Sequence, residues 1–210
     1  MKIGSWKSAV LASAGIVGIA VFLTASAAPP VTQTAPAIVQ GISLEVDPAE
    51  SKVHYTVDST LHAVHGTFAI KKGSLVRFEP ATGKASGEVA VYATSGESGN
   101  SSRDERMHKE ILETAKYPDA IFRPGQIEGK VSPTGSSDVK LHGVLVLHGS
   151  EHEVAVQVHA ELMGDHWKGT AAFDVPYIQW GIKDPSNWML KVKPVVNIHL
   201  DMAGPATPAK

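Results

Sequence analysis

The sequence predicts an all-β domain, an antiparallel sandwich or barrel that carries a single helix. Three observations lead to this prediction. Apolar and polar residues alternate along many short segments, which is the period of a strand with one buried face. Clusters rich in Gly, Pro, Asp and Ser separate these segments, and many strands joined by short turns are typical of sandwiches and barrels. One segment shows helical spacing instead.

The alternating segments follow one another from residue 51 to residue 202. Segment 139–149 is apolar on both faces in its middle, so we expect that something else covers part of it. Pro194 lies within a strand pattern, which predicts an edge or a bulge there. The apolar faces are Val53, Tyr55 and Val57; Val64, Phe68 and Ile70; Ala85, Gly87, Val89 and Val91; Val154, Val156, Val158, Ala160 and Leu162; Trp167, Gly169, Ala171, Phe173 and Val175; Val192, Pro194, Val196, Ile198 and Leu200.

Residues 101–118 have the spacing of a helix, with Met107 and Ile111 on one side. Ser102 can cap the helix, and Glu105 three residues later can complete a capping box. Pro118 follows the end of the pattern, where a proline is expected. We therefore expect one helix of about three turns in this segment.

The chain opens with the pattern of a secretory signal peptide. Two lysines precede an uncharged apolar run, residues 9–23, and small residues before position 28 fit a cleavage site. We expect residues 1–27 to be this signal peptide, with an uncleaved membrane anchor as the alternative. Residues 28–41, rich in Pro, Ala and Thr, are predicted to form an extended linker. Residues 42–202 then form one domain, and residues 203–210 are predicted to be a flexible tail.

Charge and cysteine content narrow the classes of function. The formal net charge is −2, and loss of Lys2 and Lys7 with the signal peptide changes it to −4. A mildly acidic exported domain is a poor candidate for binding nucleic acid or an anionic lipid surface. We expect contact with a membrane through an uncleaved anchor or during lipid exchange. The chain has no Cys, so neither disulfides nor a lipid-modified cysteine are expected.

Histidines raise the question of a metal site. His62 and His65 are three apart, but in a strand this spacing puts them on opposite faces, about 10 Å apart along the chain. The other strand histidines fall on polar faces, which predicts a solvated outer surface. His148 and His152 flank a turn and are the best remaining pair, so weak metal binding stays open. No metalloprotease motif, nucleophile elbow, phosphate loop or Cys nucleophile is present, so we expect no catalytic residues, no metal and no cofactor.

The interior of such a barrel can be filled or hollow. About eight strands closed into a barrel leave room that side chains just fill, or that holds one small ligand. The apolar faces carry no Lys, Arg, Asp or Glu, and small residues such as Ala160 and Ala171 leave space. Large neighbours such as Trp167 and Phe173 can fill the same space, so both readings stay open. A hollow lined in this way would stay dry and would favour an apolar guest.

The order of several segments carries a resemblance to a known family. The chain runs through SKVHYTV, HGTF, GEVAV, SRDERMHKEIL with KYPDAIFRP, LHGVLVLHG and FDVPYIQWGI. In this order the segments resemble the YceI family of exported lipid-binding proteins, over roughly residues 42–202. The most specific part comprises Arg103, Asp104, Met107, His108, Tyr117, Pro118 and Phe122.

The resemblance implies an extended lipocalin-like antiparallel β-barrel of about eight strands with one α-helix. It also implies a hydrophobic tunnel for a polyisoprenoid or similar amphiphile, a periplasmic or secreted location, and a homodimer. Met107 and Ile111 would pack the helix near the mouth of the tunnel, and Trp180 matches a late aromatic–glycine step of the family. The remaining ligand-binding residues implied by matching segments are Val53, Tyr55, Val57, Phe68, Val89, Val91, Phe122, Leu145, Phe173 and Ile198.

The chain departs from the family pattern in residues 59–68, STLHAVHGTF, and in residues 182–190, IKDPSNWML. These departures are expected to reshape one end of the tunnel. The leading hypothesis is an exported, non-catalytic carrier or sequestering protein for a polyisoprenoid, an isoprenoid quinone or another long-chain isoprenoid or fatty amphiphile. The alternative is a structural or sensing protein of the cell envelope, related to stress, with a filled barrel and weak metal binding by histidines.

Overall fold

The computed structural model describes residues 41–132 and 134–209. The predicted signal peptide, residues 1–27, and residues 28–40 of the predicted linker lie outside the described residues. No helix in the described ranges has the length and hydropathy of a membrane span. The elements are β1 Ile42–Glu45, β2 Lys52–Ser59, β3 Ala63–Ile70, β4 Leu75–Glu79, β5 Lys84–Glu97, α1 Ser101–Arg106, the π-helix η1 Met107–Ile111, β6 Asp119–Glu128, β7 Gly135–Leu147, β8 Ser150–Met163, β9 His166–Val175 and β10 Val192–Pro208.

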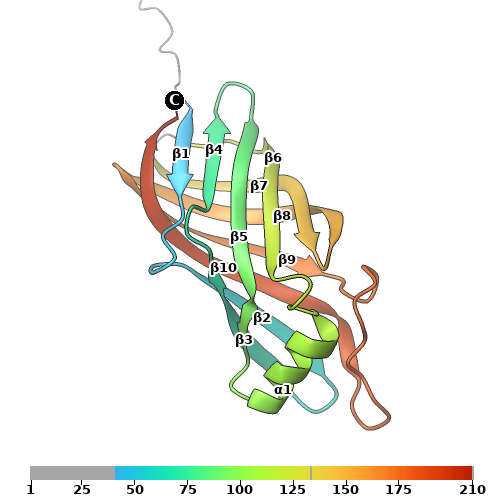
Figure 1. The fold of residues 1–210 in the computed structure, drawn as a ribbon. Coiled ribbons are helices and arrows are strands. Elements are labelled where there is room, and N and C mark those ends of the chain that lie inside the picture. Colours follow the sequence, from blue (N-terminus) through green and yellow to red (C-terminus); the bar gives the residue numbers. More distant parts are fainter. Residues whose placement is uncertain (1–40, 133, 210) are drawn as a thin grey trace, which may run out of the picture. The chain divides into compact units, whose positions relative to one another are not determined.

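Eight of the strands form a closed antiparallel barrel (Figure 1). The strand order is β5, β3, β2, β10, β9, β8, β7, β6, and β6 pairs back with β5 to close the ring. Each of these pairs is antiparallel. The predicted fold class, an all-β barrel of about eight strands with a short helix, is confirmed.

The two further strands, β1 and β4, lengthen the barrel without changing the number of strands around its axis. The first part of β10 pairs with β2, and its last residues, Ala206–Pro208, pair with β1. In the same way the first part of β5 pairs with β4 and its last part with β3. Since β1 also pairs with β4, eight strands surround the axis at either end. We call these the β1/β4 end and the β2/β3 end, and Figure 1 shows them at the top and bottom of the barrel.

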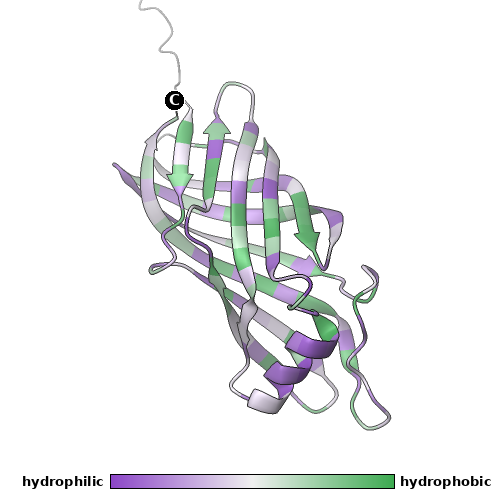
Figure 2. Ribbon diagram, in the orientation of Figure 1, coloured by the Kyte–Doolittle hydropathy of each residue, from purple (hydrophilic) through white to green (hydrophobic). Residues whose placement is uncertain are grey.

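The strands bury the faces that the alternation predicts, and the banding of apolar and polar residues along them is visible in Figure 2. Val53, Val89, Val156, Ala171 and Leu200 are buried in one hydrophobic cluster, although they come from five different strands. The register between β10 and β2 shifts between Val192 and Val196, a stretch that contains Pro194. The predicted bulge at that proline is confirmed, because a residue without an N–H cannot keep the ladder regular.

The helical segment, Ser101–Ile111, has about the three turns that were predicted, but it is capped by a different residue. The side chain of Asn100 accepts a hydrogen bond from the backbone N–H of Arg103 at 3.0 Å, so Ser102 lies inside the helix and does not cap it. After Arg106 the helix widens, and the N–H of Leu112 donates to the carbonyl of Met107, five residues earlier. Glu113 then takes a positive φ of 46°, which stops the helix before Pro118.

The predicted flexible tail, residues 203–210, is for the most part the end of β10. Ala206 is buried, and its N–H donates to the carbonyl of Asp165 at 2.7 Å. The small residues serve close packing here, since a Cβ at Gly204 would lie 2.3 Å from the carbonyl oxygen of Glu45. A composition of Gly, Ala and Pro indicates a loose tail in the sequence, but it also fits a strand that crosses closely over its neighbour.

Candidate functional site

An apolar cavity of about 650 Å³ lies inside the barrel. All ten strands contribute to its lining, from Ile42 and Phe78 at the β1/β4 end to His62 and Leu190 at the β2/β3 end. Pockets that enclose one small ligand have volumes of about 300–1,000 Å³. The interior is therefore hollow. Of the two alternatives that the sequence left open, a filled and a hollow barrel, the structure has the hollow one.

Most of the predicted ligand-binding residues line this cavity. Their side chains are apolar, and they come from strands on all sides of the barrel and from η1. The family resemblance suggested them, and alternation had independently put those in β2, β3, β5, β9 and β10 on apolar faces, which point inward in a closed sheet. They are Val53, Tyr55, Val57, Phe68, Val89, Val91, Met107, Ile111, Phe122, Leu145, Phe173 and Ile198.

Trp180 is the exception, because it does not line the cavity. Its ring stacks on the ring of His152 with centroids 4.0 Å apart, beside a shallow depression on β8 and β9. The chain turns after β9, and the turn directs Tyr177 and Ile182 into the cavity in place of Trp180. Trp180 and Gly181, the aromatic–glycine step of the sequence, therefore belong to the turn, with the Trp180 ring on the outer side of the barrel.

Tyr177 is the residue whose position raises the clearest chemical question. It lines the cavity, is 4% exposed, and packs with Leu145, Val175 and Ile182. Among the described residues its hydroxyl has no hydrogen-bond partner. Burial, with a smaller contribution from Asp184, raises the pKa of Tyr177 to about 12, so the hydroxyl stays protonated and can donate.

The sequence analysis missed Tyr177, although the signal was present. The predicted inward face of β9 ended at Phe173 and Val175, and the next position of the same parity is 177. A buried hydroxyl without a partner costs about 1–3 kcal/mol in proteins. The hydroxyl is therefore an unpaired donor enclosed in the cavity wall.

The charged lining residues and most of the polar ones lie at the β2/β3 end, while Ser137 lies toward the other end. In the described part of the chain, Arg103 and Arg106 of α1 are the formally charged residues that line the cavity, and no carboxylate does. Asn100 and Ser59 line it nearby. The sequence analysis did not place Arg103 and Arg106 in the cavity wall, because a helix position shows no strand parity.

The helical segment is held against the barrel by close contacts. The hydroxyl of Tyr55 lies 3.7 Å from the sulfur of Met107, and the Tyr55 ring packs on Phe68 with centroids 5.2 Å apart. Burial raises the pKa of the Tyr55 hydroxyl above its ordinary value. Position 96 must be Gly, since a Cβ there would lie 2.4 Å from Phe68 and 2.7 Å from Met107. The start of η1 thereby becomes part of the cavity wall.

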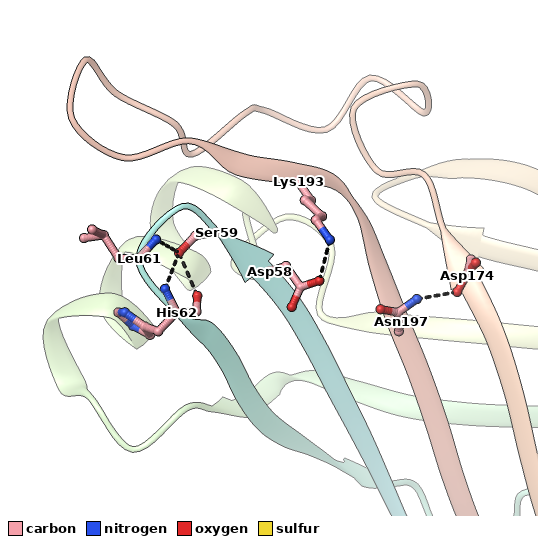
Figure 3. Close-up of polar contacts among 7 residues, drawn as sticks. All are labelled: Asp58, Ser59, Leu61, His62, Asp174, Lys193 and Asn197. Atoms are coloured by element: carbon pink, nitrogen blue, oxygen red, sulfur yellow. Dashed lines mark hydrogen bonds and ion pairs between the residues drawn. The ribbon is translucent and has the colours of Figure 1, made fainter.

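The turn between β2 and β3 closes the rim of this end (Figure 3). The hydroxyl of Ser59 donates to the carbonyl of His62 at 2.7 Å and accepts from the backbone N–H groups of Leu61 and His62. Beside the turn, Lys193 binds Asp58 at 2.8 Å. His62 therefore lies in this turn as an exposed residue at the edge of the cavity.

The histidines on the polar faces of the strands lie on the outer surface, as predicted, and five of them contact carboxylates. His54 lies 3.4 Å from Asp201, and His159 lies 2.7 Å from Asp138. His148 and His152 have separate partners, because His148 contacts Glu113 at 2.7 Å while His152 stacks on Trp180. Within residues 41–132 and 134–209 no group of three or more His, Cys, Asp or Glu side chains could hold a metal ion.

Comparison with known proteins identifies a domain family. The sequence profile of the YceI-like domain matches residues 44–203. Among solved structures, the fold is similar to that of Burkholderia cenocepacia BcnA, with a TM-score of 0.61 and 20% identity over 76% of this chain and 99% of that one. No curated protein sequence matches the chain.

Two further solved structures share the fold. One is a polyisoprenoid-binding domain from Saccharophagus degradans, with a TM-score of 0.58 and 13% identity over 81% of this chain and 99% of that one. The other is the YceI protein of Campylobacter jejuni, with a TM-score of 0.54 and 17% identity over 68% of this chain and 84% of that one. At these identities the likeness concerns the fold.

Proposed function

Because the chain belongs to the YceI-like domain family, we propose that it is a non-catalytic protein that binds one long-chain isoprenoid or fatty amphiphile inside its barrel. The observation that carries this proposal is the cavity of about 650 Å³ with its apolar lining. Each buried methylene of a guest contributes about 0.8 kcal/mol, so a long chain binds without any ionic contact. A solved relative of the same fold is described as a polyisoprenoid-binding domain, which supports this class of ligand.

The distribution of polar residues gives the ligand a direction. Arg103 and Arg106 line the largely apolar cavity at the β2/β3 end, and Tyr177, whose enclosed hydroxyl has no partner among the described residues, lines it as well. An amphiphile placed with its polar head at this end would keep its tail against Val89, Val158 and similar side chains. An isoprenoid quinone has the required chemistry, because its carbonyl oxygens accept hydrogen bonds and its tail is hydrocarbon.

The protein would act as a carrier or a sequestering protein without changing its ligand. Among the residues that the structure describes, the cavity lining includes an unpartnered tyrosine and two arginines, and no carboxylate or histidine pair that could work as acid and base. We further propose export to the periplasm or the exterior through residues 1–27, on the basis of their signal-peptide pattern.

The test is recovery of the ligand from the full chain expressed in a bacterial host. Native mass spectrometry should show one added mass per chain, and organic extraction should release an isoprenoid or fatty compound. A chain that carries no adduct and takes up no isoprenoid quinone after delipidation would contradict the proposal.

A matched pair of variants separates the cavity from the outer surface. Ala160→Phe places a ring in the cavity and should reduce bound ligand strongly, because Ala160 belongs to the lining. Ala172→Phe, on the exposed face of β9, should leave the bound ligand unchanged. Equal ligand content in both variants would show that the guest does not occupy the cavity.

A further inference from the structure

Three large apolar side chains project into solvent on two neighbouring loops. Trp188 is 87% exposed, Leu61 is 73% exposed and Met189 is 67% exposed, the three highest values among large apolar residues in the described part of the chain. We call these three residues the apolar tip. Leu61 points away from the barrel at the outer edge of its turn in Figure 3.

The two loops are tied together by hydrogen bonds. The N–H of Thr60 donates to the carbonyl of Lys191 at 2.9 Å, and the N–H of Lys191 donates to the hydroxyl of Thr60 at 3.3 Å. The side-chain oxygen of Asn187 accepts hydrogen bonds from the backbone N–H groups of Met189 and Leu190. The backbone N–H of Asn187 donates to the carbonyl of Leu190. This tight turn holds positions 188 and 189 outward, so the exposure of the tip is built into the backbone.

The same two loops also form part of the cavity wall. Ser59 and His62 line the cavity from the first loop, and Pro185 and Leu190 line it from the second. Each loop therefore presents one side to the cavity and apolar side chains to the outside. These are also the stretches, 59–68 and 182–190, in which the chain departs from its family pattern.

We propose that the apolar tip is a membrane-docking surface, and that it inserts into the interfacial layer of a phospholipid bilayer. Trp is favoured at this depth because its ring is apolar while its N–H remains hydrated. Charge complementarity supports the bilayer as the partner, since Arg103 and Arg106 border the cavity at the same end and suit lipid phosphates. Of the acids at this end, Asp58 pairs with Lys193, and Glu110 pairs with Lys183 and also, at 3.6 Å, with Arg106. Arg103 forms no ion pair within the described residues, so its charge is the one available to a phosphate.

Docking at this place would bring the cavity edge against the bilayer surface. A lipid could then pass between bilayer and barrel with little exposure of its tail to water, which would cost about 0.8 kcal/mol per methylene. This consequence rests on the proposed function. The docking itself does not, because it depends on the exposed side chains and not on the cargo.

Site-specific labelling tests the docking. The chain has no Cys, so a single one can be introduced by Met189→Cys and labelled with the polarity-sensitive dye NBD. The matched control is Met163→Cys, because Met163 is 45% exposed at the turn between β8 and β9, at the other end of the barrel. The full chain is used, and residues 1–27 are therefore common to both proteins.

Vesicles of phosphatidylethanolamine with a minor share of phosphatidylglycerol serve as the bilayer. The dye at position 189 should shift its emission to shorter wavelength and gain several-fold in intensity, while the dye at position 163 should change little. Equal responses at the two positions, or no response at position 189, would overturn the proposal. Because no cargo is needed, failure here would leave the proposed ligand binding untouched.

A transfer measurement connects the tip to function. Replacing Leu61, Trp188 and Met189 together by Ser should slow the movement of an isoprenoid quinone from vesicles to the protein about tenfold or more. Met163→Ser should leave the rate unchanged. Affinity for the same quinone in detergent solution should be equal in all three proteins, and a loss of that affinity with the tip variant would show that the tip belongs to the binding site and is not a docking surface.

Discussion

The two ends of the barrel each carry a tryptophan, and the two residues are used in opposite ways. At the β1/β4 end, Trp167 is 3% exposed, and its indole N–H donates to the carbonyl of Glu45 at 2.7 Å. At the β2/β3 end, Trp188 is 87% exposed on a loop. Paired strands β1, β4 and β10 form the wall of the first end, while a helix and two loops contribute to the second. The difference indicates a tunnel with one end built from paired strands and another end built in part from loops.

The largest expected effect comes from exchanging these two tryptophans for alanine. Trp167→Ala should lower the free energy of unfolding by about 3–5 kcal/mol, because it removes a buried ring at the β1/β4 end and leaves the carbonyl of Glu45 unpaired. Trp188→Ala should change it by less than about 0.5 kcal/mol, as for other surface substitutions. Urea denaturation of both variants measures the difference. Similar losses would mean that the two ends do not differ in this way.

Tyr177→Phe is expected to act in two directions. Without ligand the variant should be more stable by about 1 kcal/mol, because the buried hydroxyl has lost its water without gaining a partner. With an isoprenoid quinone bound, affinity should fall about threefold to tenfold, the value of one hydrogen bond. Thermal unfolding and a binding titration measure the two effects. Tyr55→Phe is the control, and a gain in stability there as well would refute the assignment to Tyr177.

A smaller, pH-dependent effect is expected from His152. Burial lowers its pKa below the ordinary value of 6.5, so the unfolded chain takes up a proton in a range where the folded protein does not. The free energy of unfolding should therefore fall as the pH drops below about 6.5, and it should stop falling once the pH is below the pKa of His152 in the folded protein. Comparing urea denaturation near pH 7 and near pH 5 measures this slope. His152→Phe keeps an aromatic ring on Trp180 and should make the free energy of unfolding depend less on pH. An unchanged dependence would mean that other titrating groups cause it.

The smallest effect is expected at the rim of the β2/β3 end. Asp58 and Lys193 form an exposed ion pair at 2.8 Å. Such pairs contribute about 0–1 kcal/mol, and salt screens them. Asp58→Asn should therefore shift the urea midpoint only slightly, and the shift should disappear in high salt. A large shift that persists in salt would indicate that the pair fixes the position of the loop.

The sequence was informative where strands alternate and uninformative where the chain turns. Val53, Val89 and Ile198 could be placed inside the barrel because alternate residues of a strand point to opposite faces of the sheet. The alternation of apolar and polar residues therefore separates the inner face from the outer one. Trp180, which the family resemblance suggested, does not line the cavity, and it follows the end of β9, where parity no longer applies. Whether the interior is hollow could not be read from composition, since that depends on how large side chains from opposite strands share one volume.

The helix and the chain end illustrate the same limit. Ser102 and Asn100 are both good caps, and which of them bonds the free N–H groups depends on where β5 releases the chain. The Pro- and Ala-rich end was read as a flexible tail because its composition suits one, yet pairing with β1 extends β10 to Pro208. In both cases a tertiary contact decides between two local structures that the sequence allows.

The most direct measurement is a high-resolution structure of the full chain purified from its host without organic solvent. The account predicts one continuous, narrow density along the barrel axis, with its polar end within hydrogen-bond distance of the Tyr177 hydroxyl and its tail reaching toward Trp167. An interior occupied by protein side chains alone, with Phe122 and Phe173 meeting across the axis, would contradict it.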